Sequence, residues 1–232
     1  MKKFIAKFFR LTIKWFLIGF VVLCILSAGL VGGLRWIDPP TSQFILQYEQ
    51  SAKRSAKHQW VDFENIAWHM PLAVIASEDQ QFPQHQGFDW VQIRKAVEDF
   101  QKGKTLRGAS TISQQTIKNL FLTSEKTLVR KSIEAWLTFW LELTVPKKRI
   151  LEIYLNIAQF GKSSFGVSAA ANHYYGITAK QLNPAQSRLL ATCLPAPSRC
   201  KPLKPSKHTL KKTAWIETSM RNLGGKRVID QL

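Results

Sequence analysis

An uninterrupted apolar run near the N-terminus constrains this chain more than any other feature. Between Trp15 and Leu34 the sequence reads WFLIGFVVLCILSAGLVGGL and contains no charged residue. A helix of about 20 such residues is long enough to cross the hydrocarbon core of a membrane. A cleaved signal peptide is the alternative, but its apolar core usually has about 7 to 15 residues, and Ser27-Ala28-Gly29 is a weak cleavage site. We therefore predict a retained membrane anchor over residues 15–35.

The charges that flank this anchor predict its orientation. Only Arg35 follows the run closely, whereas five cations precede it: Lys2, Lys3, Lys7, Arg10 and Lys14. Basic residues beside a membrane span stay preferentially in the cytoplasm. We therefore expect residues 1–14 to form a cytoplasmic basic tail and residues 36–232 to form one extracytoplasmic domain.

The predicted domain is itself strongly basic. The chain has a formal net charge of +18, and the segment up to Arg35 supplies six positive charges and no acid, which leaves +12 for residues 36–232. Such a surface suits nucleic acid or an anionic membrane, but outside the cytoplasm anionic lipid and phosphate-bearing substrates are the commoner partners. We interpret the charge as membrane-facing and expect no nucleic-acid partner. A solvated basic face without a single partner is the alternative.

The rest of the sequence predicts a mainly α domain. Helices with start and stop signals are expected over residues 41–57, 72–81, 90–101, 111–122, 127–145, 147–158, 167–175, 184–194 and 209–222. Asp89 and Ser110 occupy positions expected of N-caps. No alternating apolar and polar run is long enough to predict a strand with conviction.

The cysteines and histidines predict no structural metal site, because no Cys/His spacing is typical of zinc ligands. Cys24 lies in the apolar run. Cys193 and Cys200 flank a loop that contains Pro195 and Pro197, where a disulfide is geometrically feasible in an oxidising compartment. Free thiols are the alternative.

Glu78 is the first candidate for chemistry. It follows the apolar residues 72–76 and has no Lys or Arg within 15 residues on either side. Burial among such neighbours would raise the pKa of its carboxyl toward that of a useful general base. A carboxylate satisfied by local N–H groups is the alternative.

The helix expected after Gly108-Ala109 has one polar face. Gln115 and Lys118 fall within about 40° of Thr111 around its axis. With Ser110 as N-cap, the free N–H groups at this helix start and the nearby lysine would form a site for an anion such as phosphate. A capped, solvated amphipathic helix is the alternative.

Glu134 is the second candidate carboxylate, and it has Arg130 at i−4 and Lys131 at i−3. The two cations favour its ionised form, whereas desolvation by the neighbouring tryptophans would raise its pKa, so the sequence leaves its protonation state open. A salt bridge that only supports the helix is the alternative.

Four motifs in order carry a family resemblance. They read E-D-x-x-F-x-x-H-x-G-x-D from Glu78, G-A-S-T-I-x-Q-Q-x-x-K-N from Gly108, R-K-x-x-E from Arg130, and R-I-L-E-x-Y-L-N-x-x-x-x-G from Arg149. This series resembles the peptidoglycan glycosyltransferases of family 51 over residues 60–222. With one anchor and no transpeptidase domain expected after residue 230, the chain is similar to the monofunctional biosynthetic transglycosylases rather than to class A penicillin-binding proteins.

The resemblance implies that lipid II is polymerised into glycan strands. The 4-hydroxyl of an acceptor N-acetylglucosamine attacks the anomeric carbon of the growing chain and expels undecaprenyl pyrophosphate with inversion. Glu78 matches the general base, and Glu134 matches a second catalytic glutamate that positions or stabilises the donor. The implied substrate-binding residues are Asp79, Phe82, His85, Ser110, Thr111, Gln115, Lys118, Asn119, Arg130 and Lys131. For His85 a hydrogen-bonded structural role is preferred, and Glu152, Tyr154 and Asn156 are expected to be scaffold.

The resemblance also implies a lysozyme-like helical lobe and a small membrane-apposed lobe, which we place between Val91 and Arg107. The expected location is the inner membrane with the catalytic domain in the periplasm, and the expected partners are lipid II, undecaprenyl-pyrophosphate-linked glycan and the membrane. Other cell-wall synthases or division proteins are further candidates. No cofactor is required, and a divalent cation (Mg²⁺ or Mn²⁺) at the diphosphate stays an open alternative.

The sequence departs from the family pattern at three positions. Gln159, Ser168 and Gln186 stand where many relatives have glutamate, which affects local packing and any divalent-ion contact on that side.

Two rival functions remain open. A lysozyme-type hydrolase also uses two carboxylates on a helical fold, and a non-catalytic membrane scaffold would present a basic surface to cell-wall synthases.

Overall fold

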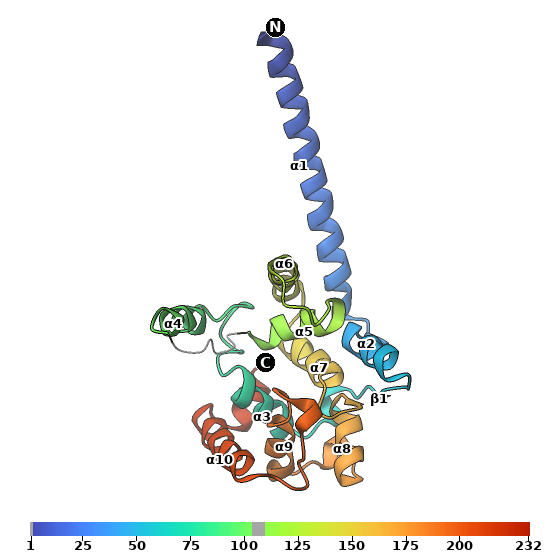
Figure 1. Ribbon diagram of the computed structural model, residues 1–232, viewed down its shortest axis with the longest axis vertical. Coiled ribbons are helices and arrows are strands. Elements are labelled where there is room, and N and C mark those ends of the chain that lie inside the picture. Colours follow the sequence, from blue (N-terminus) through green and yellow to red (C-terminus); the bar gives the residue numbers. More distant parts are fainter. Residues whose placement is uncertain (1, 104–109) are drawn as a thin grey trace.

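The computed structural model describes the backbone of residues 2–103 and 110–232, and side chains from residue 8 onward within these ranges. The described chain is mainly helical (Figure 1). Its α-helices are α1 (Lys2–Gly32), α2 (Gln43–Ala52), α3 (His69–Glu78), α4 (Trp90–Gln101), α5 (Ile112–Phe121), α6 (Leu128–Thr144), α7 (Lys147–Ile157), α8 (Val167–Tyr175), α9 (Pro184–Ala191), α10 (Lys207–Asn222) and α11 (Lys226–Asp230). Short 3₁₀ helices are η1 (Gly33–Arg35), η2 (Phe63–Asn65), η3 (Ala179–Gln181) and η4 (Pro197–Arg199). Two short strands, β1 (Lys57–His58) and β2 (Ser164–Phe165), pair in parallel, with Lys57 opposite Ser164.

The predicted mainly α class is confirmed, and the errors lie at helix ends. The helix expected to reach residue 57 ends at Ala52, because Lys53 adopts a left-handed conformation with φ 49° and the chain then turns into β1. Helix α3 begins before Pro71, which stands in the first turn, where a missing N–H costs no hydrogen bond. Helix α11 has no counterpart in the prediction.

Helix α1 runs continuously through the predicted basic tail and the predicted anchor. The segment Phe8–Arg35, which comprises most of α1 and the following η1, is long and apolar enough to span a membrane, judged by length and composition alone. Large side chains such as Phe16 and Leu26 are exposed, as lipid-facing residues would be. Lysine and arginine have a high helix propensity, so the basic residues before Trp15 continue the helix rather than end it.

The lower part of α1 packs against α6. Ser27 Oγ accepts a hydrogen bond of 2.9 Å from the indole N–H of Trp136, and Val31 is fully buried. The Phe20 ring packs against that of Trp136 in a tilted arrangement, with the ring centroids 5.9 Å apart. The anchor is therefore joined to the domain through the helix that carries Glu134.

The core forms around α3, α5 and α7. Helix α3 is apolar on all sides and packs against α9 and α10, so it lies inside the domain rather than on its surface. Helix α5 packs against α6 and α7. Seven consecutive residues of α3, Met70 to Ala76, are buried. Truncating a fully buried Ile or Leu in such a core to Ala costs about 2 to 5 kcal/mol.

Helix α4 stands apart from this core, at the left of Figure 1. None of its residues is buried, and Asp89 caps its start by accepting a hydrogen bond of 2.9 Å from Gln92 N–H, as predicted. Trp90, Val91 and Phe100 are exposed. This helix is the described part of the predicted small lobe, and residues 104–107 of that lobe lie outside the described residues.

Cys193 and Cys200 form a disulfide with their Cα atoms 5.0 Å apart, which decides between the two alternatives left by the sequence. The bridge closes the loop that contains η4.

Candidate active site

Glu78 is the last residue of α3 and opens into a cleft of about 470 Å³. The other walls come from the start of α4, from Ser110 and Thr111 before α5, and from Trp215 of α10. The cleft therefore collects residues from four segments that lie far apart in the sequence.

The Glu78 carboxylate is half-buried and contacts two neutral donors. Ser77 Oγ donates to its Oε1 at 3.1 Å, and Gln115 Nε2 donates to its Oε2 at 3.3 Å. Within the described part of the chain, no cation forms an ion pair with Glu78. A hydroxyl group that enters the cleft would therefore meet a carboxylate that no described cation neutralises.

Tyr154 fixes the orientation of Gln115. Its hydroxyl donates to Gln115 Oε1 at 3.0 Å, which leaves the amide nitrogen facing Glu78. Burial, with smaller contributions from the charges of Glu78 and Asp79, raises the pKa of Tyr154 well above its usual value. The phenol is thus a permanent hydrogen-bond donor behind the carboxylate. The sequence predicts a scaffold role for Tyr154 and does not predict its contact with Gln115. The R-I-L-E-x-Y motif, which contains Tyr154, is the sequence feature that could have indicated a place at the site.

Asp79 is buried and links three segments. Its Oδ2 accepts from Ile112 N–H at 2.9 Å, and His85 Nε2 lies 2.9 Å from the same oxygen. Gly87 N–H donates to His85 Nδ1 at 3.0 Å, so the ring proton of the neutral tautomer lies on Nε2 and points at Asp79. Asp79 and His85 therefore hold the start of α5 beside the end of α3, which agrees with the structural role preferred for His85.

Gly87 brings the loop after α3 against α6. Its φ is +86°, and a Cβ there would lie 2.9 Å from side-chain atoms of Thr138 and Glu142. Thr111 Oγ1 donates to the Gly87 carbonyl at 2.7 Å. Phe82, in the same loop, is fully buried and packs in the core, so it supports the cleft from behind.

The N-cap of α5 is Thr111, not Ser110. Thr111 and Gln114 form a reciprocal capping box, and the hydroxyl of Thr111 is also used by the bond to Gly87. The predicted cap was wrong because both residues are good caps by type, and the contact with Gly87 selects Thr111. Ser110 is exposed and accepts from Lys131 Nζ at 3.4 Å, while Gly108 and Ala109 of the predicted anion site lie outside the described residues.

Glu134 is buried, with 2% of its side chain exposed, and forms ion pairs with both Arg130 and Lys131. The structure thus brings the predicted trio together. Lys118 lies close enough to interact with the charges of this trio. Burial lowers the pKa of its ammonium group, and the positive charges of Arg130 and Lys131 lower it further, whereas the negative charges of Glu134 and Glu78 raise it. One acid among three cations leaves an excess of positive charge, which suits an anion at the cleft. We call Lys118, Arg130, Lys131 and Glu134 the cation cluster.

The remaining motif residues have structural positions. Asn119 is buried on α5. Asn156 exchanges two hydrogen bonds of 2.8 Å with the backbone of Val61, and Glu152 accepts from Phe63 N–H at 3.0 Å. These two residues hold the segment before α3 against α7, as expected of scaffold. Trp215 was not predicted, and no local pattern in α10 marks it as a cleft residue.

Among the described residues of the cleft and the cation cluster, the side chains form no group suited to a resident metal ion. The only carboxylate of the cation cluster is already held by two cations. Among the described residues, no group of three or more His, Cys, Asp or Glu side chains has an arrangement that could hold a metal.

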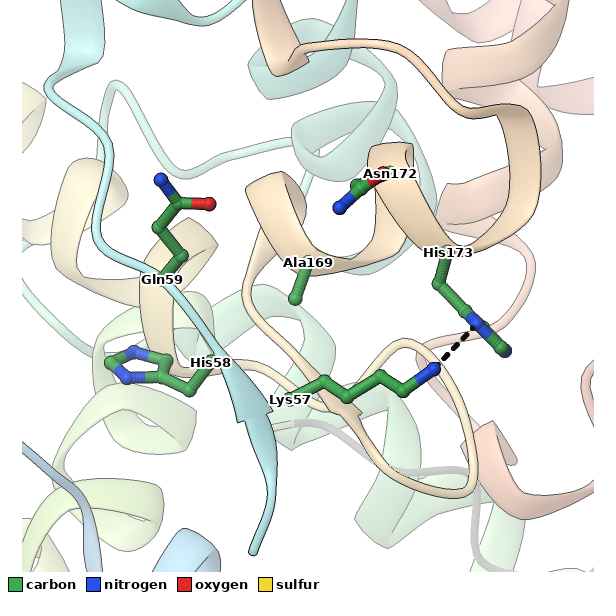
Figure 2. Close-up of a pocket in the computed structure, with 6 residues that line it drawn as sticks. All are labelled: Lys57, His58, Gln59, Ala169, Asn172 and His173. Atoms are coloured by element: carbon green, nitrogen blue, oxygen red, sulfur yellow. Dashed lines mark hydrogen bonds between the residues drawn. The ribbon is translucent and has the colours of Figure 1, made fainter.

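A second hollow, of about 450 Å³, lies between β1 and α8 (Figure 2). Lys57 Nζ lies 3.2 Å from His173 Nδ1 at its rim, and the described residues that line it include no carboxylate. Ser168 is nearby and contacts Gln59 at 3.4 Å. Gln159 and Gln186 also make local bonds, to Lys162 O and within the α9 capping box, so none of the three departures reaches the Glu78 cleft.

Comparison with known proteins places this site in a family. The sequence model of the family described as transglycosylase matches residues 44–221, which include the cleft and the cation cluster. The biosynthetic peptidoglycan transglycosylase of Chromohalobacter salexigens is 48% identical over 178 residues, which cover 77% of this chain and 76% of that protein. That of Shewanella oneidensis is 46% identical over 194 residues, covering 82% and 83%. That of Xanthomonas campestris pv. campestris is 43% identical over 222 residues, covering 93% and 90%. The chain therefore belongs to the transglycosylase family of peptidoglycan glycosyltransferases.

Proposed function

We propose that this peptidoglycan transglycosylase polymerises lipid II by inverting transfer of the growing glycan to a new acceptor. The observation that carries the proposal is the placement of the Glu78 carboxylate, with which no described cation forms an ion pair, in a cleft beside a cluster with excess positive charge. One group can take a proton from the acceptor, and the other can receive the charge of the leaving group.

Glu78 is the proposed general base. The acceptor 4-hydroxyl gives its proton to the carboxylate while its oxygen forms a bond to the anomeric carbon of the donor. The bond between that carbon and the pyrophosphate oxygen breaks on the opposite face, and its electron pair leaves with undecaprenyl pyrophosphate. Gln115 and Ser77 hold the carboxylate in place through neutral hydrogen bonds that leave its charge intact.

The cation cluster is the proposed diphosphate site. Lys118, Arg130 and Lys131 would bind the phosphate oxygens and stabilise the negative charge that develops as the bond breaks. Glu134 is buried against Arg130 and Lys131, so its proposed role is to hold these cations in position rather than to transfer a proton. The exposed hydroxyl of Ser110 beside Lys131 adds a further donor or acceptor at the same place.

Cations of the chain, rather than a metal ion, are the proposed source of charge neutralisation. We expect activity to persist after exhaustive treatment with a chelator. Loss of activity on chelation, with recovery on adding Mg²⁺ or Mn²⁺, would show that a divalent ion is required.

The proposed location is the inner membrane, with the N-terminus in the cytoplasm and residues 36–232 in the periplasm. The apolar side chains exposed on α1 support membrane insertion, and the exposed Trp90 and Phe100 of α4 support contact of the small lobe with lipid. This arrangement would present the cleft to a lipid-linked substrate.

The test supplies labelled lipid II to the full chain in detergent and separates polymer from substrate. Glu78→Gln should slow polymer formation by about a hundredfold or more, since a general base contributes about 10² to 10⁴ to the rate. Glu64→Gln is the matched control at an exposed glutamate and should leave the rate unchanged. An unchanged rate in Glu78→Gln removes the proposed base. A wild-type protein that only shortens existing glycan would instead support the hydrolase.

A further inference from the structure

A third hollow, which is lined by cations, lies at the start of α10, outside the active site and apart from the hollow between β1 and α8. It has a volume of about 350 Å³ and is lined by Arg199, Lys201, Lys204, Lys212 and His208, together with hydroxyl side chains. This volume lies within the range of small-ligand sites, about 300 to 1,000 Å³. We call it the α10 basic pocket.

The segment that carries these cations is held at both ends. The disulfide between Cys193 and Cys200 closes the loop before Lys201. At the other end Ser206 caps α10 by accepting a hydrogen bond of 3.2 Å from Thr209 N–H. The pocket is therefore built on fixed backbone rather than on a free tail.

The charge of the α10 basic pocket is not neutralised by the protein. Residues 195–216 contain no Asp or Glu. In the part of the chain that the structure describes, no ion pair involves any of its four Lys and Arg side chains, whereas Arg149 pairs with two acids and Lys147 with one. Four neighbouring cations repel one another, and a bound polyanion would relieve this repulsion.

Its position disfavours a lipid headgroup as the anion. Helix α10 and the loop that precedes it lie at the end of the domain opposite the membrane helix α1 (Figure 1). The attraction between a basic segment and an anionic membrane surface falls off within about 8 Å at physiological salt.

The same position places the pocket next to the active-site cleft. Lys212 of the pocket precedes Trp215, which lines the Glu78 cleft, by three residues on α10. This spacing corresponds to about 4.5 Å along the helix axis and about 60° around it. A ligand that extends from the cleft along α10 would therefore reach the pocket.

We propose that the α10 basic pocket binds the carboxylates of the peptide branches carried by the glycan whose sugars occupy the cleft. The identity of this glycan rests on the proposed function, whereas binding of carboxylates to the pocket does not depend on catalysis. Peptide branches end in carboxylates and project sideways from the sugar chain, so branches directed away from α1 would extend toward the end of the domain where the pocket lies. The pocket would hold the glycan by its peptides next to the cleft.

The test measures binding of a fluorescent, lipid-free disaccharide-peptide to the full chain in neutral detergent by anisotropy. The pocket variant is Lys204→Gln with Lys212→Gln. The matched control is Lys207→Gln with Lys211→Gln, which removes the same charge from α10 outside the pocket lining. We expect the pocket variant to bind roughly tenfold more weakly, the loss of about 1.4 kcal/mol of charge-assisted hydrogen bonding, and the control to bind like wild type. Amidating the carboxyls of the probe should weaken wild-type binding to the level of the pocket variant. Thermal unfolding of both variants checks that they fold.

Three results would overturn the proposal. Equal losses in the two double variants would show a general charge effect, and equal binding of the amidated probe would exclude carboxylate recognition. Binding to anionic lipid vesicles that is lost only in the pocket variant would assign the pocket to the membrane instead. Probe binding is measured without turnover, so a failure of the proposed catalytic function would leave this result unaffected.

Discussion

The hydroxyl of Tyr154 provides the sharpest test of how the active site is built. Tyr154→Phe removes one oxygen from a fully buried ring and leaves its volume almost unchanged. Gln115 Oε1 then loses its 3.0 Å donor, and its amide is free to rotate away from Glu78. Removing one partner of such a bond costs about 1 to 3 kcal/mol, which corresponds to a fall in the melting temperature of about 2 to 4 °C per kcal/mol for a domain of this size.

The pH dependence of stability gives this prediction a second measurement. The pKa of Tyr154 is raised in the folded protein above its usual 10.0, so below pH 10 the phenol is protonated in both folded and unfolded chains and its contribution to stability is complete. Above pH 10 only the unfolded chain releases the proton, so this contribution falls by about 1.4 kcal/mol per pH unit. The stability gap between wild type and Tyr154→Phe should therefore narrow above pH 10.

Denaturant unfolding between pH 7 and 11 measures this gap, and a lipid II assay at pH 7 measures the rate. We expect the rate of Tyr154→Phe to fall by about tenfold, less than for Glu78→Gln, because the base remains but one of its donors is misplaced. Tyr48→Phe is the control, since the Tyr48 hydroxyl accepts a hydrogen bond from Arg54 on the surface. This variant should polymerise at the wild-type rate, and its stability difference from wild type should not narrow above pH 10. A Tyr154→Phe protein with wild-type stability and rate would refute the proposed role of the Tyr154–Gln115 contact.

Three further substitutions test the local structure around the cleft. Thr111→Ala should lower the free energy of unfolding by about 1 kcal/mol through loss of the α5 cap, whereas Ser110→Ala should leave it unchanged. Denaturant unfolding measures both, and a larger loss in Ser110→Ala would instead support Ser110 as the cap. Gly87→Ala should lower the free energy of unfolding by at least about 1 to 3 kcal/mol, because the new Cβ would clash with α6. Gly103→Ala, also at positive φ but in open space, should cost less stability, and equal losses of stability would mean that backbone conformation alone matters. Glu134→Gln should lower the free energy of unfolding by about 1 to 3 kcal/mol and weaken the binding of inorganic pyrophosphate, because Arg130 and Lys131 lose the acid that positions them. Calorimetry measures the pyrophosphate affinity, and an unchanged affinity would argue against this positioning role.

Local sequence signals predicted much of the fold. Helix α8 has the predicted bounds, α7 ends one residue early and α6 is one residue shorter at each end, because apolar periodicity and capping residues are properties of neighbouring positions. The apolar run predicted the anchor for the same reason. The errors occur where a distant contact decides, as at α5, where Gly87 selects Thr111 over Ser110 as the cap.

By itself the sequence determined the helical class, the basic character of the domain, the apolar N-terminal helix and the choice of two candidate glutamates, all of which depend on residue type and short spacing. Only the tertiary structure decided what surrounds those glutamates. Gln115 reaches Glu78 across 37 positions and Tyr154 reaches Gln115 across 39, while Trp215 closes the cleft from the far end of the chain. Contacts at such separations arise from the packing of α3, α5, α7 and α10, which no local pattern encodes. That packing brings an oriented neutral donor, Gln115, to the half-buried carboxylate of Glu78.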